Sequence, residues 1–195
     1  MTAQDGRQTG APRGAAAPHA PWTYRPAVPG DAAECVALRG MTRENAVSAA
    51  RLRALGITAR SWGDDIRSGA LPGHVCSAGG KIVGYCFGSS QDGEIVVLAL
   101  LPAFEGQGIG RELLSRMVRD LAALGQTRLF LGCSRDPASR SYGFYRHLGW
   151  RSTARFDRRG DEILELHLRG SPARAAGREY EGKGFHHADD KPHFP

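Results

Sequence analysis

The segment from residue 94 to residue 124 constrains the fold more than any other part of the chain. Residues 94–101 read EIVVLALL, an almost continuous apolar run that predicts a central strand buried on both faces. The glycine-rich loop PAFEGQGIG follows at once, and residues 110–124 then carry leucine, methionine and valine at helical spacing up to Gly125. A strand buried on both faces needs helices on both sides, so this segment predicts an α/β protein.

Strand and helix patterns alternate along the rest of the chain. Further strands are predicted at residues 23–28, 74–78, 81–88, 127–133, 150–156 and 162–168, with Gly79-Gly80 as a hairpin turn. Helical patterns occupy residues 32–39, 42–55, 62–68 and 139–147, with Asp31 as a candidate N-cap for the first. This order predicts a single-domain α/β fold, with one mixed sheet of about six to seven strands and helices on both faces.

Composition indicates the bounds of the folded domain and the cellular compartment of the protein. Residues 1–21 and 170–195 lack hydrophobic periodicity, so we expect a disordered N-terminal tail and a flexible C-terminal tail around a domain at residues 22–169. No apolar stretch approaches the roughly 18 residues that span a bilayer, and the N-terminus lacks the apolar core of a signal peptide. We therefore expect a cytoplasmic protein without a membrane partner. The four cysteines show no metal-ligand spacing, so reduced thiols and no bound metal are expected.

The glycine loop has the composition of a phosphate-binding site. A helix N-terminus presents unpaired N–H groups and the positive end of the helix dipole, and glycines let an anion approach the backbone. The net charge of +6 also suits an anionic ligand. The loop lacks the Gly-Lys-Ser/Thr of a Walker A motif, and its G-x-G-x-G spacing departs from the G-x-G-x-x-G of a dinucleotide site. From this loop alone, another phosphate ligand and a tight turn that binds nothing both stay open.

Three blocks in order resemble the GNAT superfamily of Gcn5-related N-acetyltransferases. The strand at residues 98–100, followed by Pro102 and the glycine loop, is similar to the family's acetyl-CoA signature, Q/R-x-x-G-x-G/A after an L-x-V-x-P strand. The segment SRSYGFYRHLGW at residues 139–150 resembles the second block, a helix with a tyrosine followed by a glycine and an aromatic residue. The start, YRPA followed by Asp31, is also similar, so the resemblance covers about residues 24–168.

The resemblance implies an N-acetyltransferase that moves an acetyl group from acetyl-CoA to a primary amine by direct attack in a ternary complex. The amides of Leu98, Ala99 and Leu100 would lie along the pantetheine, with the Leu98 N–H on the thioester oxygen. The pyrophosphate would be held by the backbone of Gly106, Gln107, Gly108, Ile109, Gly110 and Arg111.

Two side chains are candidates for the proton transfers. Tyr145 is the candidate general acid for the leaving thiolate, with Tyr142 as a weaker competitor, and a packing tyrosine is the structural alternative. Glu94 stands four residues before Leu98, where histone acetyltransferase-like members of the superfamily place a glutamate, so the resemblance makes it the candidate base for the amine. A polar residue after a glycine turn is its structural alternative. His74 and His147 are further candidates for a base, and Cys133 for a nucleophile.

Two positions depart from the family pattern. The family usually has Gln or Arg where this chain has Glu105, and a carboxylate aimed at a pyrophosphate would repel it. Either Glu105 turns away and the amides bind the phosphates, or cofactor affinity is reduced. The family also often has Asn where this chain has Ala138, so one side-chain contact to the cofactor is expected to be lost.

The acceptor is a small-molecule or peptide amine whose identity the sequence leaves open. Its specificity is expected to come from residues 41–71 and from the final hairpin. The polar and aromatic candidates there are Arg43, Glu44, Asn45, Arg51, Arg53, Trp62, Asp64 and Asp65.

Other classes of protein fit parts of the sequence. The basic balance permits a GNAT-like toxin that acetylates charged tRNA, but the chain has no dense basic patch or RNA-binding motif, which argues against a nucleic-acid partner. A non-catalytic CoA-binding module is supported by Glu105 and Ala138, and a purely structural α/β domain is the third alternative. Dimers are common in the family, so the resemblance favours a homodimer.

Overall fold

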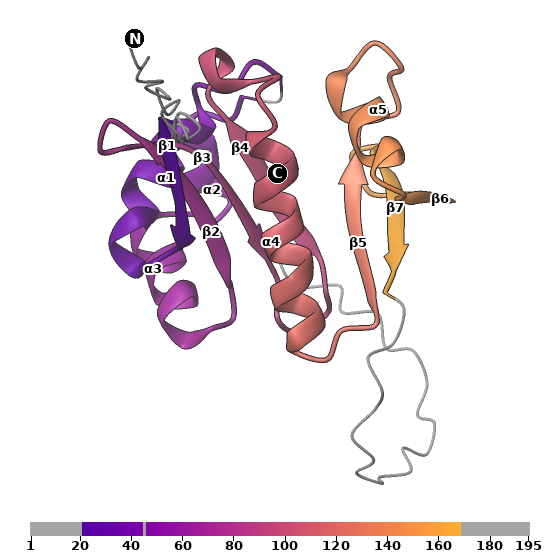
Figure 1. The fold of residues 1–195 in the computed structure, drawn as a ribbon, viewed down its shortest axis with the longest axis horizontal. Coiled ribbons are helices and arrows are strands. Elements are labelled where there is room, and N and C mark those ends of the chain that lie inside the picture. The colour runs from indigo at the N-terminus through magenta and orange to yellow at the C-terminus, as the bar shows by residue number, and fades with distance from the viewer. Residues whose placement is uncertain (1–20, 45, 169–195) are drawn as a thin grey trace, which may run out of the picture.

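The computed structural model describes residues 21–44 and 46–168 (Figure 1). The predicted tails, residues 1–21 and 170–195, lie outside this range apart from Pro21. The strands are β1 (Trp22–Pro26), β2 (Gly73–Ala78), β3 (Lys81–Gly88), β4 (Ile95–Leu100), β5 (Arg128–Cys133), β6 (Arg151–Phe156) and β7 (Glu162–His167). The helices are α1 (Ala32–Arg39), α2 (Ala49–Ala54), α3 (Ala59–Ser68), α4 (Ile109–Ala123) and α5 (Arg140–His147), with short 3-10 turns η1 (Pro29–Asp31) and η2 (Pro102–Phe104).

The first four strands form an antiparallel sheet in the order β1-β2-β3-β4. Gly79 and Gly80 turn the chain from β2 into β3 with φ angles of +56° and +78°, which glycine adopts without strain. Every residue of β3 after Lys81 is buried, and most of β4 is buried as well. Both strands are therefore largely buried, as the sequence predicts for residues 94–101.

The remaining strands form a second antiparallel sheet in the order β5-β7-β6. The two sheets meet at one parallel bridge between Glu94 and Phe130, where the Phe130 N–H donates to the carbonyl of Gly93 at 3.2 Å. Within the described residues no ladder joins β4 to β5 beyond that bridge. The α/β class and the strand number are confirmed, and the sheet divides in two because the pairing of β4 with β5 stops there.

Helices cover both faces of the first sheet, as predicted (Figure 1). Helices α1, α2 and α3 pack on one face, where the ring of Trp62 lies 6.0 Å from that of Tyr85 and 5.4 Å from that of Phe87. Helix α4 packs on the other face through Leu113 and Met117, both fully buried. The apolar stripe of α4 therefore fixes the helix, and with it the glycine loop at its N-terminus, against the sheet.

Helix α2 begins later than the cap pattern at residue 42 predicts. The Ser48 hydroxyl accepts the amide of Arg51 at 3.2 Å, which caps a helix that begins at Ala49. Residues 42–44 instead belong to a loop, in which the Thr42 hydroxyl lies 3.3 Å from the carbonyl of Arg39 and 3.1 Å from that of Glu44 and shares its one hydrogen between them. This loop carries Arg43 and Glu44 toward the glycine loop and α5.

Asp31 stands at the N-cap position of α1, but its carboxylate does not cap that helix. It instead accepts two hydrogen bonds from the Arg25 guanidinium, at 2.6 and 2.7 Å, and one from the Val28 amide at 2.8 Å. Asp31 thus ties the end of β1 to the start of α1 rather than serving the helix alone.

Candidate functional site

A cavity of about 1140 Å³ lies between β4 and β5. It opens where the pairing of these strands has ended, so the division of the sheet creates it. The glycine loop and the first turn of α4 form one wall, and α5 and the β6–β7 hairpin form another. A volume this large is at the upper end for ligand pockets and suits an extended ligand.

The edge of β4 that faces β5 presents backbone groups to this cavity. The Leu101 N–H donates to the carbonyl of Val83 at 2.9 Å, which fixes the pairing of this end of the strand with β3. Because peptide groups alternate along a strand, Ala99 and Leu101 bond to β3, whereas the amides of Leu98 and Leu100 face β5. A ligand lying along this edge meets the Leu98 and Leu100 amides, whereas the Ala99 amide, which was expected along the pantetheine, faces β3 instead.

Helix α4 begins without a side-chain cap, unlike the three helices capped by Ser48, Thr58 and Ser139. Its N-cap, Gly108, has φ +82°, and Gly106 has φ +74°. An ideal Cβ at either glycine would meet nothing within 4 Å, so these glycines serve the backbone turn and leave the loop open. The first amides of α4 and the helix dipole therefore form a site suited to an anion.

Most of the predicted cofactor-binding residues line this cavity. Its wall includes Leu98, Ala99, Leu100, Gly106, Gly108, Gly110 and Arg111. Two others do not line it with their side chains. Gln107 is exposed and its side-chain amide donates to the carbonyl of Ala103 at 2.9 Å, while Ile109, the first residue of α4, is fully buried in the core. Their proposed role rests on their main-chain groups alone.

Tyr145 also lines the cavity, from the inner side of α5. Its ring packs edge-on against Phe144 and Trp150, at centroid distances of 5.0 and 6.1 Å. Burial raises the pKa of the Tyr145 phenol above its ordinary value, so the phenol is protonated at neutral pH. Tyr142 is not part of the wall, and the centre of its ring lies 3.8 Å from Arg146 Cζ.

Arg39 and Glu94 bring opposite charges to the same cavity. Glu94 stands at the bridge where the two sheets meet and belongs to the wall. Arg39, at the end of α1, is only 9% exposed, and burial lowers the pKa of its guanidinium, with the phenols of Tyr85 and Tyr145 close enough to oppose this. Sequence reasoning missed Arg39, because an arginine in the last turn of a helix reads as an ordinary partner of the helix dipole.

The other predicted candidates for base and nucleophile are placed less favourably. His74 is buried away from the cavity, and its Nε2 lies 2.7 Å from Asp120 Oδ2. His147 is exposed at the end of α5, outside the wall. Cys133 does line the cavity, but burial raises the pKa of its thiol, which makes the thiolate scarcer.

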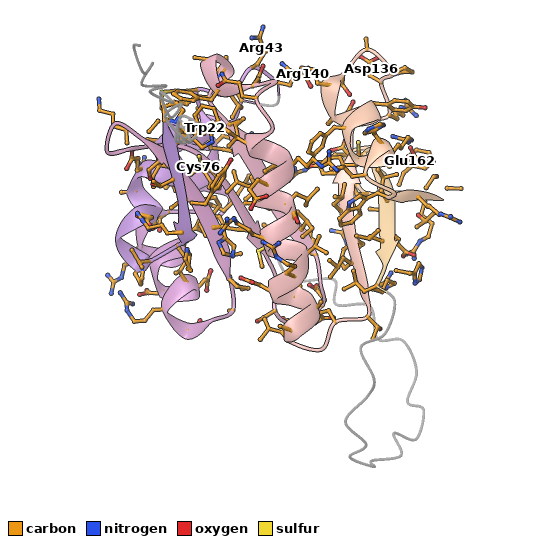
Figure 2. The ribbon with its side chains drawn as sticks, viewed as in Figure 1. Trp22, Arg43, Cys76, Asp136, Arg140 and Glu162 are labelled. Carbon is orange, nitrogen blue, oxygen red and sulfur yellow. The ribbon has the colours of Figure 1, made fainter. Side chains whose placement is uncertain are left out.

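Glu105 is held between two arginines at the mouth of the cavity. Its Oε2 accepts a hydrogen bond from Arg43 Nε at 2.9 Å and another from Arg140 Nη1. Figure 2 shows Arg43 and Arg140 together at the end of the molecule where α4 begins. These two arginines offset the negative charge of Glu105, so the repulsion of a phosphate that the sequence predicts is reduced. Nothing in the sequence indicated either pairing. The other departure, Ala138, donates its amide to Asp136 Oδ1 in a turn before α5.

Only part of the predicted acceptor region reaches the cavity. The residues of this region that line it are Thr42, Glu44, Ala46 and Val47, and from the final hairpin Arg155, Phe156, Asp157, Arg158, Arg159 and Asp161. Asn45 lies outside the described residues, and the wall does not include Arg43, Arg51, Arg53, Trp62, Asp64 or Asp65. Trp62 is 2% exposed and belongs to the core.

The hairpin adds a carboxylate pair to the cavity wall. Asp157 Oδ1 accepts the amides of Arg159 and Asp161 at 2.8 and 2.9 Å, which fixes the turn. Burial raises the pKa of Asp161, and the nearby carboxylate of Asp157 adds to this effect. The hairpin therefore brings charges of both signs to the cavity, because Arg155, Arg158 and Arg159 line it as well.

The described residues contain neither a metal-ligand cluster nor a membrane-spanning helix. Among residues 21–44 and 46–168, no three His, Cys, Asp or Glu side chains come together in a way that could hold a metal ion. No helix of this part of the chain is long and apolar enough to cross a membrane.

Comparison with known proteins assigns the family. The model of the acetyltransferase (GNAT) family matches residues 45–150, more than half of the chain. The chain therefore belongs to the GNAT family of acetyltransferases. A sequence search of curated proteins gives no match.

Solved structures agree with this assignment at the level of the fold. The PaiA N-acetyltransferase of Thermoplasma acidophilum in complex with coenzyme A has a TM-score of 0.63 at 16% identity, over 75% of this chain and 99% of that one. YhbS of Escherichia coli in complex with CoA has a TM-score of 0.60 at 22% identity, over 80% and 86%. YncA of Salmonella typhimurium with its cofactor acetyl-CoA has a TM-score of 0.59 at 20% identity, over 80% and 99%.

Proposed function

We propose that this protein transfers an acetyl group from acetyl-CoA to a primary amine, by direct attack of the amine on the thioester. The observation that carries the proposal is the N-terminus of α4, which has the glycine Gly108 as its N-cap and no side-chain cap. It faces the same cavity as the edge of β4 that is turned toward β5. Such a helix end suits a pyrophosphate, and a strand edge suits the amides of a pantetheine arm. Two of the structural relatives contain CoA and a third contains acetyl-CoA, which supports this choice of ligand.

The cofactor would run from the glycine loop to the middle of β4. Main-chain amides at residues 106–111 would hold the pyrophosphate, and Leu98 would place its N–H on the thioester oxygen. A fixed donor at this position stabilises the negative charge that develops on the oxygen during attack. Leu100 faces the same edge and would hydrogen-bond to the pantetheine.

Glu94 would accept the proton of the attacking amine. It lies at the closed end of the gap between the strands, four residues before Leu98, and on the cavity wall. Asp157 and Asp161 line the same cavity and are the carboxylates that would bind a charged amine, beside Arg155, Arg158 and Arg159 of the same hairpin. An amine held there would lose its proton to Glu94 as it attacks.

Tyr145 would donate a hydrogen bond to the departing thiolate. Because burial raises the pKa of its phenol, complete proton transfer to a thiolate is unfavourable for the isolated phenol. The positive charge of Arg39 acts in the opposite direction and favours the phenolate. We therefore assign Arg39 a supporting role, in which it makes Tyr145 a better proton donor.

Calorimetry with acetyl-CoA, free CoA and ATP tests the first half of the proposal. We expect micromolar binding of acetyl-CoA and CoA but no binding of ATP. The second half is tested by measuring thiol release from acetyl-CoA across a panel of amines that includes diamines and amino acids. Binding without thiol release for any amine would support a non-catalytic CoA-binding module instead.

A further inference from the structure

We propose that Glu105 acts as an internal anion, which occupies the arginines at the cavity mouth until the phosphate groups of the cofactor displace it. The inference rests on the proposed function, since it concerns how the same cavity binds acetyl-CoA. It assigns Arg43 and Arg140 as phosphate ligands and Glu105 as their competitor.

The geometry at the mouth brings together three segments that are distant in the sequence. A single oxygen of Glu105 receives hydrogen bonds from Arg43 in the loop after α1 and from Arg140 at the start of α5. The carboxylate side chain is 16% exposed, whereas those of Arg43 and Arg140 are 57% and 54% exposed. The anion therefore lies beneath two cations whose outer sides remain open to an incoming ligand.

A second carboxylate completes this network. Both oxygens of Glu44 lie 3.2 Å from the amide of Arg140, the first residue of α5. Glu44, Glu105, Arg43 and Arg140 thus form a cluster of two carboxylates and two guanidinium groups. Glu44, Glu105 and Arg140 all line the cavity.

The position of Glu105 makes competition with phosphate unavoidable. It directly precedes Gly106, and the uncapped amides of α4 follow Gly108. A phosphate drawn to these amides arrives beside the carboxylate and within reach of both arginines. Guanidinium groups bind phosphate with parallel hydrogen bonds, so the phosphate is a suitable replacement for the carboxylate. Glu105 is then free to turn toward solvent.

This exchange makes a prediction whose sign is unusual. Loss of an ordinary binding residue weakens affinity, but loss of a competing carboxylate strengthens it. Glu105→Gln removes the charge and keeps the size of the side chain, so acetyl-CoA should bind about three- to tenfold more tightly. The dependence of the Kd on salt should also become steeper, because the mouth gains one unit of positive charge.

The test is calorimetry of acetyl-CoA binding to the full-length chain. The variants are Glu105→Gln, Arg140→Ala and the double variant, and the control is Glu165→Gln. Glu165 on β7 pairs with Arg128 on β5, away from the glycine loop and outside the cavity wall, so its loss changes the net charge equally. We expect the control to bind within twofold of the parent chain. We expect Arg140→Ala to weaken binding more when Glu105 is Gln than when it is Glu.

Pantetheine separates the phosphate effect from a general change in the cavity. It carries the thiol arm without the phosphates, so its affinity should not change in Glu105→Gln. An equal gain for pantetheine and acetyl-CoA would overturn the inference. Thermal unfolding without ligand verifies that each variant is folded, and Glu105→Ala should change affinity in the same direction as Glu105→Gln.

The outcomes distinguish this inference from the proposed function. If the parent chain binds acetyl-CoA and Glu105→Gln binds it equally or more weakly, the inference is wrong and the proposed function stands. If only Glu105→Gln binds, the carboxylate blocks the site and the inference is supported. If neither binds, both the proposed function and the inference are wrong.

Discussion

Replacing Gly108 by valine tests whether the glycine loop binds the cofactor. Gly108 is the N-cap of α4 with φ +82°, a conformation that costs an L-residue about 1–2 kcal/mol. Its ideal Cβ would meet nothing within 4 Å, so the penalty comes from the backbone and not from a clash. Gly125, at the other end of α4, offers a matched control, with φ +93° and the same open surroundings.

Both variants should lose similar stability, but only one should lose ligand affinity. A loss of about 1–2 kcal/mol lowers the melting temperature of a domain of this size by roughly 2–8 °C. Gly108 lines the cavity whereas Gly125 does not. A valine at residue 108 either projects into the path of the phosphates or relaxes to negative φ. The second response moves the Gly108 carbonyl, which accepts the Glu112 amide at 3.1 Å.

The expected result is at least tenfold weaker binding of acetyl-CoA by Gly108→Val, equivalent to about 1.4 kcal/mol or more. Gly125→Val should bind within twofold of the parent chain. Calorimetry gives the two dissociation constants, and thermal denaturation gives the two changes in stability. If both variants bind acetyl-CoA as tightly as the parent chain, the assignment of the glycine loop as the cofactor site is wrong. Equal losses in both would mean that general destabilisation, and not the site, explains the effect.

Three further variants test the chemistry and the fold. Tyr145→Phe should lower turnover about 100-fold with little change in acetyl-CoA affinity. Because the pKa of Tyr145 is raised, its ionisation should not reduce the turnover of the parent chain at any pH up to about 10. Glu94→Gln should lower turnover at neutral pH, with a deficit that shrinks as rising pH deprotonates the amine; a deficit that is constant with pH would argue against a base. For Asp31, burial alone would raise the pKa, but hydrogen bonds from Arg25 and the Val28 amide hold it below its ordinary value. Asp31→Ala should therefore lower the free energy of unfolding by about 1–3 kcal/mol near pH 7, and urea titrations should show this difference disappear as the pH falls below about 4.

The fold was largely predictable because its signals are local. The apolar run before the glycine loop, the stripe of α4 and the turn at Gly79-Gly80 each report the environment of neighbouring residues. The start of α2 was misplaced because Thr42 and Ser48 both satisfy the rule for a cap, and only the tertiary structure selects between them. The division of the sheet was not predictable from single strands, since the end of pairing at Glu94 depends on two strands together.

In the candidate site, too, features that lie on one element were predictable, and features that depend on distant partners were not. The positions of Leu98, Gly108 and Tyr145 on the cavity wall follow from segments that the sequence already marked, because each motif lies on one element. The role of Glu105 could not be predicted from its own segment, because its partners Arg43 and Arg140 lie 62 and 35 residues away in the chain. Read alone, it is a negative charge beside a phosphate site and predicts weaker binding. Placed between two arginines, it becomes the group that keeps two cations at the mouth, and its removal should strengthen binding.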